Sequence, residues 1–281
     1  MSTPPTPAAD AGSLREIADR IRGHVVDMCA GQEGGHLGGS LSVVDILAVL
    51  YFSVLRTSLD DPDRDIFVLS KGHAAPALYA TLAERGFLAL SELASFGMPG
   101  SRLMGHPVRE VPGVEMPTGS LGHGLALGLG FALAARLASS PRRIFVVTGD
   151  GELQEGSCWE AAGCAAALRA DRLVAIVDRN GLQLSGRTED ICALEPLADR
   201  WSAFGWSVRE VPGHDQAGLA SALAAAPWEP GRPSVLLART EKGHGIPFLA
   251  GQPICHYATL SERQHRKVRA ALAAFTRGRP S

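Results

Sequence analysis

The chain has 281 residues, of which 46% are hydrophobic and 20% are charged. A chain of this length and composition buries a large core and is not intrinsically disordered. Its formal net charge is only -2 and it has no strongly basic segment, so we expect no nucleic acid partner.

The first twelve residues contain neither the basic segment nor the apolar segment of a signal peptide. We interpret residues 1–12 as a disordered tail and residues 13–281 as one domain. The most apolar stretch, residues 125–137, is shorter than the roughly 20 residues that cross a bilayer, so we expect no membrane association. The 5 cysteines form no CxxC pair and indicate free thiols in a reducing compartment, which favours a cytoplasmic location.

Helices and strands are predicted to alternate along the chain. A helix is expected over residues 13–29, with Ser13 and Glu16 at capping-box spacing, and a second from Ser42 after a glycine-rich break. Apolar strands are predicted at 65–70, 143–149, 172–178, 205–211 and 233–240, and the other helices at 71–86, from 125, 156–169 and 261–276. Because the strands are apolar throughout, we predict a mostly parallel sheet between two helical layers, a three-layer α/β/α fold.

Two polar turns follow neighbouring strands of this predicted sheet. Gly149, Asp150 and Gly151 follow one strand, and Asn180 follows the next. Neither a G-x-G-x-x-G fingerprint nor a P-loop is present. The alternative to a binding site here is that both segments are ordinary turns. Since the carboxyl ends of consecutive parallel strands meet at one edge, a carboxylate and an amide oxygen are expected to converge there. These are Mg²⁺ ligands, and a helix N-terminus after Gly151 would favour an anion, so the sequence predicts a magnesium diphosphate site.

The segment "GDGELQEG…VDRNGLQLSG" resembles the thiamine diphosphate motif, and more specifically the amino-terminal half of transketolases. The resemblance extends through "GGHLGGSLSVVDILAVLYF", "SKGHA", "MGHPV", "PTGSLGHG" and "FGWSVREVPGHD", and covers roughly residues 13–256. It implies a thiamine diphosphate-binding fold, with thiamine diphosphate and Mg²⁺ or another divalent cation as cofactors. It also implies transfer of a two-carbon ketol unit from a ketose phosphate to an aldose.

The resemblance assigns roles to individual residues. The metal ligands would be Asp150, Asn180 and the main-chain oxygen of Leu182. Other cofactor contacts would come from His73, Gly119, Leu121, Gly149, Gly151, Glu160 and His256. The catalytic residues would be His36 and His106, which face the substrate, and Glu155, which matches a glutamate at the subunit interface.

Three assignments depart from the family pattern or stay open. Leu37 stands where proline is usual, and His123 where glutamine is common. For the late phosphate-contacting histidine, His256 is the better match and His244 the competitor. A zinc site of His73, His106 and His123 is an alternative, although no HxxxH or CxxC spacing supports it.

In transketolases the glutamate that activates the aminopyrimidine ring lies in a second domain. No stretch of this chain matches that domain, so we expect a split enzyme. A separate carboxy-terminal subunit would complete the site, and the family implies an α2β2 heterotetramer. Two alternatives remain: a subunit of another thiamine diphosphate enzyme, similar to deoxyxylulose phosphate synthase or to the oxo-acid dehydrogenases, or a non-catalytic scaffold.

Overall fold

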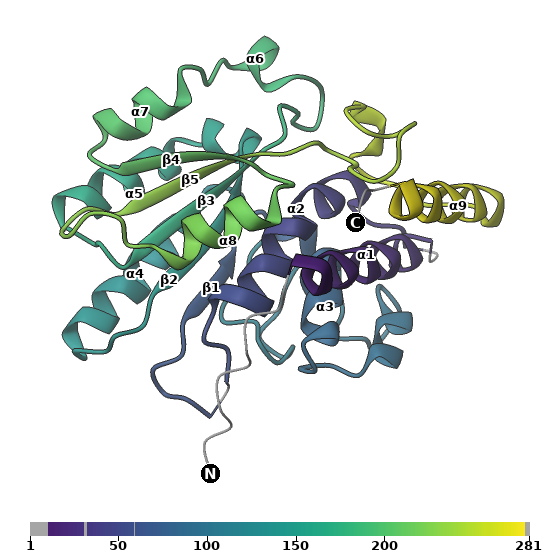
Figure 1. The fold of residues 1–281 in the computed structure, drawn as a ribbon, viewed down its shortest axis with the longest axis horizontal. Helices are drawn as coiled ribbons and strands as arrows, with labels where there is room; N and C mark the ends of the chain where they lie inside the picture. The colour runs from purple at the N-terminus through teal and green to yellow at the C-terminus, as the bar shows by residue number, and fades with distance from the viewer. Residues whose placement is uncertain (1–10, 31–32, 59, 279–281) are drawn as a thin grey trace.

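The structure, a computed structural model, describes residues 11–30, 33–58 and 60–278 (Figure 1). Its centre is a sheet of five parallel strands in the order β1-β2-β3-β5-β4. The strands are β1 (Ile66–Leu69), β2 (Ile144–Gly149), β3 (Leu173–Arg179), β4 (Ser207–Pro212) and β5 (Ser234–Arg239). The predicted parallel α/β sheet is therefore confirmed.

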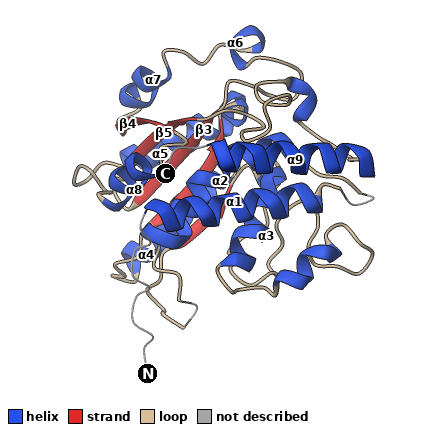
Figure 2. Cartoon of the chain, turned by 45° about the vertical axis from the view of Figure 1, so that its right-hand side comes forward, coloured by secondary structure: helices blue, strands red, loops and turns tan. Residues whose placement is uncertain are grey.

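Helices cover both faces of this sheet, which gives three layers (Figures 1 and 2). One layer contains α1 (Ala11–Met28), α2 (Leu37–Val49), α3 (Ala75–Glu84) and α8 (Gln216–Ala224), and α9 (Glu262–Gly278) lies along α1. The opposite layer contains α4 (Gly124–Leu137), α5 (Gly156–Ala167) and α7 (Leu197–Ala203). The short helix α6 (Thr188–Ile191) lies in the connection between β3 and α7.

Alternate residues of a strand pack against opposite helical layers, because successive side chains of a strand point to opposite faces of the sheet. Phe145 and Val147 of β2 join the core with α1, α2 and α3. Ile144 and Val146 join the core with α4 and α5. Both sets are fully buried, which explains why the central strands read as continuous apolar runs. The edge strand β4 departs from that pattern, since most of its residues are partly exposed.

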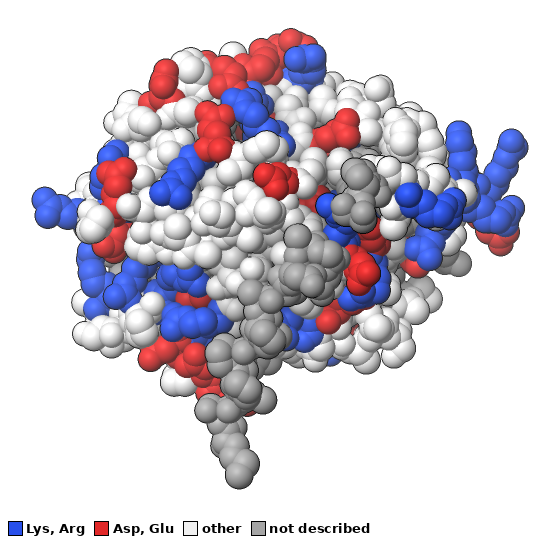
Figure 3. All heavy atoms as spheres, viewed as in Figure 1, with Lys and Arg blue, Asp and Glu red and all other residues white. Residues whose placement is uncertain are grey.

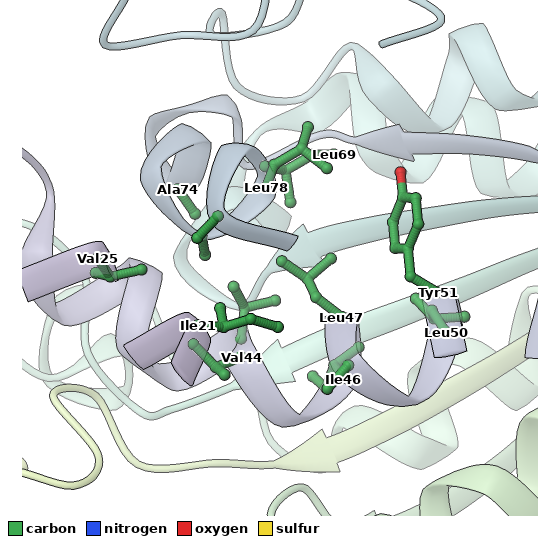
Figure 4. Packing of buried hydrophobic residues seen from close by; sticks show 14 of the residues in the cluster. Ile21, Val25, Val44, Ile46, Leu47, Leu50, Tyr51, Leu69, Ala74 and Leu78 are labelled. Carbon is green, nitrogen blue, oxygen red and sulfur yellow. The ribbon is translucent and has the colours of Figure 1, made fainter. Parts of the chain in front are cut away.

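The helix α2 is the centre of the larger core. Figure 4 shows Val44 and Leu47 of this helix packed between Ile21 of α1 and the neighbouring elements. Every residue of α2 is buried. The stretch Leu37–Val54 is long and apolar enough to cross a membrane, but 89% of it is buried inside the protein. Its apolar character is therefore explained by its position in the core.

Several predicted boundaries were wrong. Helix α1 begins at Ala11, two residues before the predicted start at Ser13; residues 1–10 of the predicted tail lie outside the described residues. Helix α2 begins at Leu37, five residues before the predicted start at Ser42. Gly38 lies inside α2. A Cβ at this position would lie 2.4 Å from the Cys255 sulfur, so a larger residue would not fit there. Close packing, not helix breaking, explains this glycine.

The surface carries charges of both signs. Figure 3 shows acidic and basic side chains interspersed over one face, with basic side chains gathered at the end where α9 lies. This distribution agrees with the near balance of 27 basic and 29 acidic residues in the sequence.

Candidate active site

The two polar turns meet at the carboxyl edge of the sheet, as predicted. Strand register pairs Gly149 with Asp178, so the residues that follow them are neighbours. The Asp150 carboxylate is buried, and its Oδ2 accepts a hydrogen bond from the Gly181 amide at 2.6 Å. The two ends of the motif are thus held in one site by a direct contact.

The Asp150 carboxylate is held in a fixed orientation by its donors. Its Oδ1 accepts from the Gly151 amide at 2.8 Å, and its Oδ2 also accepts from Arg179 Nη1 at 2.9 Å. Burial, and secondarily the nearby Asp178, raise the pKa of Asp150, while Arg179 opposes that rise. A buried carboxylate of this kind gains from an additional cation.

The other predicted metal ligands lie on the same turn. The side-chain oxygen of Asn180 accepts a hydrogen bond from the Leu182 amide at 3.1 Å. Between them Gly181 has a φ of +78°, which glycine adopts without strain. Carboxylate, amide and main-chain oxygens are the donor set of Mg²⁺, so these residues fit a hard divalent cation.

Two buried lysines lie beside this oxygen cluster, and sequence reasoning missed both. Lys71 Nζ donates to the Gly39 carbonyl at 2.9 Å and pairs with Asp178. Lys242 Nζ lies 3.1 Å from His256 Nδ1, and burial followed by the charge of Lys71 lowers its pKa. Lysine is seldom buried without a carboxylate partner, and Lys242 has none among the described residues, so these cations beside a cation site fit an anion such as a diphosphate. Both lysines directly precede glycine-histidine pairs in the sequence, which was the available signal.

Four histidines converge above the lysines. The ring of His36 lies 5.1 Å from His73, 6.1 Å from His106 and 5.2 Å from His256, measured between centroids. Burial, then the neighbouring His256 and His106, lower the pKa of His36 to about 4. Burial followed by Lys242 lowers the pKa of His256 to about 4, and burial places the pKa of His73 well below its ordinary value. Neutral imidazoles at pH 7 can both donate and accept hydrogen bonds.

The structure separates the two candidates for the late histidine. His256 lies 5.7 Å from His73 within the cluster. His244 instead stacks on His214 at 3.4 Å, in a contact network that includes Asp45 and Glu241. His256 is therefore the histidine that accompanies His36 and His73.

Loops that contain glycine approach one another closely around the site, because a side chain at these positions would not fit. A Cβ on Gly72 would lie 2.7 Å from the Gly119 nitrogen, and a Cβ on Gly119, whose φ is +150°, would lie 2.8 Å from the His106 ring. A Cβ on Gly151 would lie 2.8 Å from Gln183 Cβ. Gly149 ends β2, and the loop that carries Gly119 and the half-buried Leu121 lies at the same strand edge, where Thr118 donates to the carbonyl of Leu69 at the end of β1.

Glu152 is a further residue that sequence reasoning missed. It is buried, and its carboxylate accepts from the Ser70 hydroxyl, from the Gly122 amide at 3.0 Å and from the Gly149 amide at 3.0 Å. These donors belong to two separate loops of the site and to the end of β2. Burial raises the pKa of Glu152, and the three donors oppose the rise.

The other predicted residues lie away from this cluster. Glu155 and Glu160 are exposed at the start and on the outer face of α5. The helix predicted over residues 156–169 begins at Gly156, after a 3-10 turn, Gly151–Gln154. His123 is exposed just before α4, and the only histidine-containing group with metal-ligand spacing among the described residues is Asp45, His214 and His244. The zinc alternative of His73, His106 and His123 therefore has no geometric support.

Comparison with known proteins identifies the family. The model of the transketolase thiamine diphosphate binding domain matches residues 13–276. A protein of Phocaeicola vulgatus, named as one of the subunits of apulose-4-phosphate transketolase, is 40% identical over 258 residues, which are 91% of this chain and 92% of that protein. A 6-deoxy-6-sulfo-D-fructose transketolase subunit from a Clostridium species is 42% identical over 242 residues, 85% of this chain and 88% of its own.

Solved transketolases have the same fold over this chain. The transketolase of Campylobacter jejuni matches with a TM-score of 0.86 and 31% identity, and that of Leishmania mexicana with 0.85 and 33%. Each match covers 94% of this chain but only 43% and 44% of the solved proteins, so the chain spans less than half their length. The chain belongs to the transketolase family, in which it corresponds to the thiamine diphosphate binding domain.

Proposed function

We propose that the chain is the amino-terminal subunit of a two-chain transketolase that moves a two-carbon ketol unit from a ketose phosphate to an aldose. The observation that carries the proposal is the 2.6 Å bond from the Gly181 amide to Asp150, which unites both ends of the motif beside converging histidines. The relatives named as transketolase subunits have nearly the length of this chain, and solved transketolases are more than twice as long. A separate chain would supply the remainder.

The residues at the strand edge would hold the cofactor. Asp150, Asn180 and the Leu182 carbonyl would bind Mg²⁺, while Lys71, Lys242, His73 and His256 would face the diphosphate. The backbone at Gly119, Leu121, Gly149 and Gly151 would approach it closely. When bound, thiamine diphosphate supplies the electron sink for breaking and forming the carbon–carbon bond.

The histidines of this chain would accept and donate the protons of the sugar hydroxyls. His36 is neutral at pH 7 because its pKa is about 4, so its imidazole can accept a hydroxyl proton and return it. His106 lies 6.1 Å from it, between ring centroids, so one sugar can contact both rings. Their side chains would orient the donor hydroxyls and exclude water from the reacting carbon.

The exposed acids on α5 suit a subunit interface. Glu155 and Glu160 are exposed in this chain and would contact the carboxy-terminal subunit, which carries the aminopyrimidine-activating glutamate. Closed symmetry would then give an α2β2 heterotetramer.

All 5 cysteines are free, which supports a reducing, cytoplasmic location.

Magnesium-dependent cofactor uptake tests the cation site. Asp150→Ala should lower thiamine diphosphate affinity at least ~10-fold in the assembled enzyme, measured by calorimetry with Mg²⁺ or EDTA. Asp199→Ala, which removes an exposed acid of α7, is the matched control and should bind normally. Normal Mg²⁺-dependent uptake by the Asp150 variant would refute the assignment.

The alternatives give different products. A decarboxylating enzyme would release carbon dioxide from pyruvate, and a scaffold would bind no cofactor. The buried Lys242 argues against a scaffold, because it pairs with no carboxylate among the described residues and a buried charge is costly to keep without a ligand.

A further inference from the structure

A small pocket of about 200 Å³ opens beside the histidine cluster. His36 and His106 form one side of it, and the remaining side chains are mostly apolar: Pro76, Phe96, Met104 and Tyr257. Since His36 and His106 are the residues proposed to face the sugar, this pocket is where part of the substrate would lie.

The charges near the pocket are distributed unevenly. Of the described residues that line it, none is lysine or arginine, and Glu33 is the one carboxylate. The two buried lysines contact the Gly39 carbonyl and His256, on the side of the cation site. A phosphate in this pocket would lose water and meet a carboxylate instead of a cation, which is strongly unfavourable.

Tyr257 is fixed as a wall of this pocket. Its ring packs edge-on against His36, 5.0 Å between centroids, and its hydroxyl donates to the Glu33 carbonyl. The adjacent Ala258 is paired with Gly35 by two backbone hydrogen bonds of 2.9 Å. The ring is therefore held from both ends, yet the residue is still 50% exposed toward the opening.

We propose that Tyr257 is the specificity-determining residue of this pocket, and that it admits a narrow, uncharged part of the sugar. This inference rests on the proposed function. A rigid wall discriminates by excluding a larger group, whereas attraction alone would separate related sugars poorly. The phosphate of the substrate would then lie outside the pocket.

The test compares two pairs of aldoses in the assembled enzyme loaded with thiamine diphosphate and Mg²⁺. Erythrose and apiose differ by a branching hydroxymethyl group, and erythrose and erythrose 4-phosphate differ by the phosphate. Tyr257→Ala should raise the kcat/KM of apiose relative to erythrose by about 10-fold, the scale on which a pocket discriminates one extra carbon. The ratio between erythrose 4-phosphate and erythrose should not change.

Tyr257→Phe is the matched control, because it keeps the ring and removes only the hydroxyl. It should leave both ratios as in the wild type. An equal change in all three sugars, a shift of the phosphate ratio by Tyr257→Ala, or the same shift in Tyr257→Phe would each overturn the proposal. Tyr257→Leu replaces Tyr257→Ala if the alanine variant does not load cofactor.

A failure of the proposed function would be seen in the wild-type enzyme and not only in the Tyr257 variants. If the wild-type assembly transfers no ketol unit to any aldose, the transketolase assignment fails. Dissociation constants of the three sugars, measured by calorimetry with the same variants, still report the selectivity of the pocket and follow the same expected ratios.

Discussion

At the scale of single residues, Glu152 has the most demanding position in the site. Its buried carboxylate accepts hydrogen bonds from Ser70 and Gly122, which lie on two different loops, and from Gly149 at the end of β2. Without it, these donors would lose their acceptor in a place with little access to water. Glu152 therefore contributes to the shape of the site although it contacts none of the proposed metal ligands.

Glu152→Ala should lower the free energy of unfolding by about 3 kcal/mol, because three buried donors lose their partner. Glu152→Gln keeps the volume and one acceptor oxygen, so it should lose less. Urea denaturation of both variants measures the difference. Equal stability of the alanine variant and the wild type would show that the three hydrogen bonds do not hold the loops.

His256 provides a pH-dependent prediction. Its folded pKa is about 4, below the ordinary 6.5, so the unfolded chain takes up the proton more readily. The contribution of His256 to stability is therefore complete above about pH 6.5 and is lost as the pH falls through about 4. His256→Asn should flatten the decrease in unfolding free energy over this range, measured without cofactor. An unchanged slope would contradict the burial of a neutral ring.

The residues of the site were unevenly predictable. Asp150 and Asn180 were found because the ends of consecutive parallel strands must meet, and the structure confirms that meeting. Lys71 and Lys242 were missed because burial of a lysine depends on loops distant in the sequence. The choice between His256 and His244 needed the same information about distant contacts.

At the scale of elements, glycines decide how closely the loops approach. Gly72 precedes α3 and has the Gly119 nitrogen and Thr118 within 2.7 Å of the position of a Cβ. Those neighbouring atoms include backbone, which cannot rotate away as a flexible side chain can. Gly130 lies on α4 with nothing within 4 Å of a Cβ.

These two glycines form a matched pair. Gly72→Ala should destabilise the chain and weaken cofactor binding, because the loops at Gly72 and Gly119 must separate. Gly130→Ala should stabilise it by about 0.4–1 kcal/mol, since alanine favours the helix and has room. Thermal unfolding and cofactor titration measure both. Tolerance of Gly72→Ala with full cofactor affinity would show that the close approach is dispensable.

The sequence predicted the type of each helix and strand better than it predicted the residues at which each begins and ends. The five predicted runs became five strands, and the four apart from the edge strand β4 have the composition that suits burial on both faces. The start of α2 was misplaced because Gly38 and Gly39 usually end helices, whereas here tertiary packing against Cys255 and His73 requires them. Local propensity is weak beside such packing.

At the scale of the whole molecule, the site is partly open to solvent. Strand ends, lysines and histidines of this chain surround the cation site, and Met104 and Tyr257 remain exposed at the pocket. The chain also spans only 43% of the Campylobacter jejuni transketolase. A half-site of this kind predicts that catalysis depends on a second polypeptide.

Titration of a carboxy-terminal transketolase subunit into a fixed amount of this chain shows whether the two chains form one enzyme. Ketol transfer from a ketose phosphate to an aldose is measured with thiamine diphosphate and Mg²⁺, and again without each. We predict no transfer by either chain alone, and cofactor-dependent activity that saturates at equal amounts of the two chains. Full activity of this chain alone, or activity without thiamine diphosphate, would contradict the account.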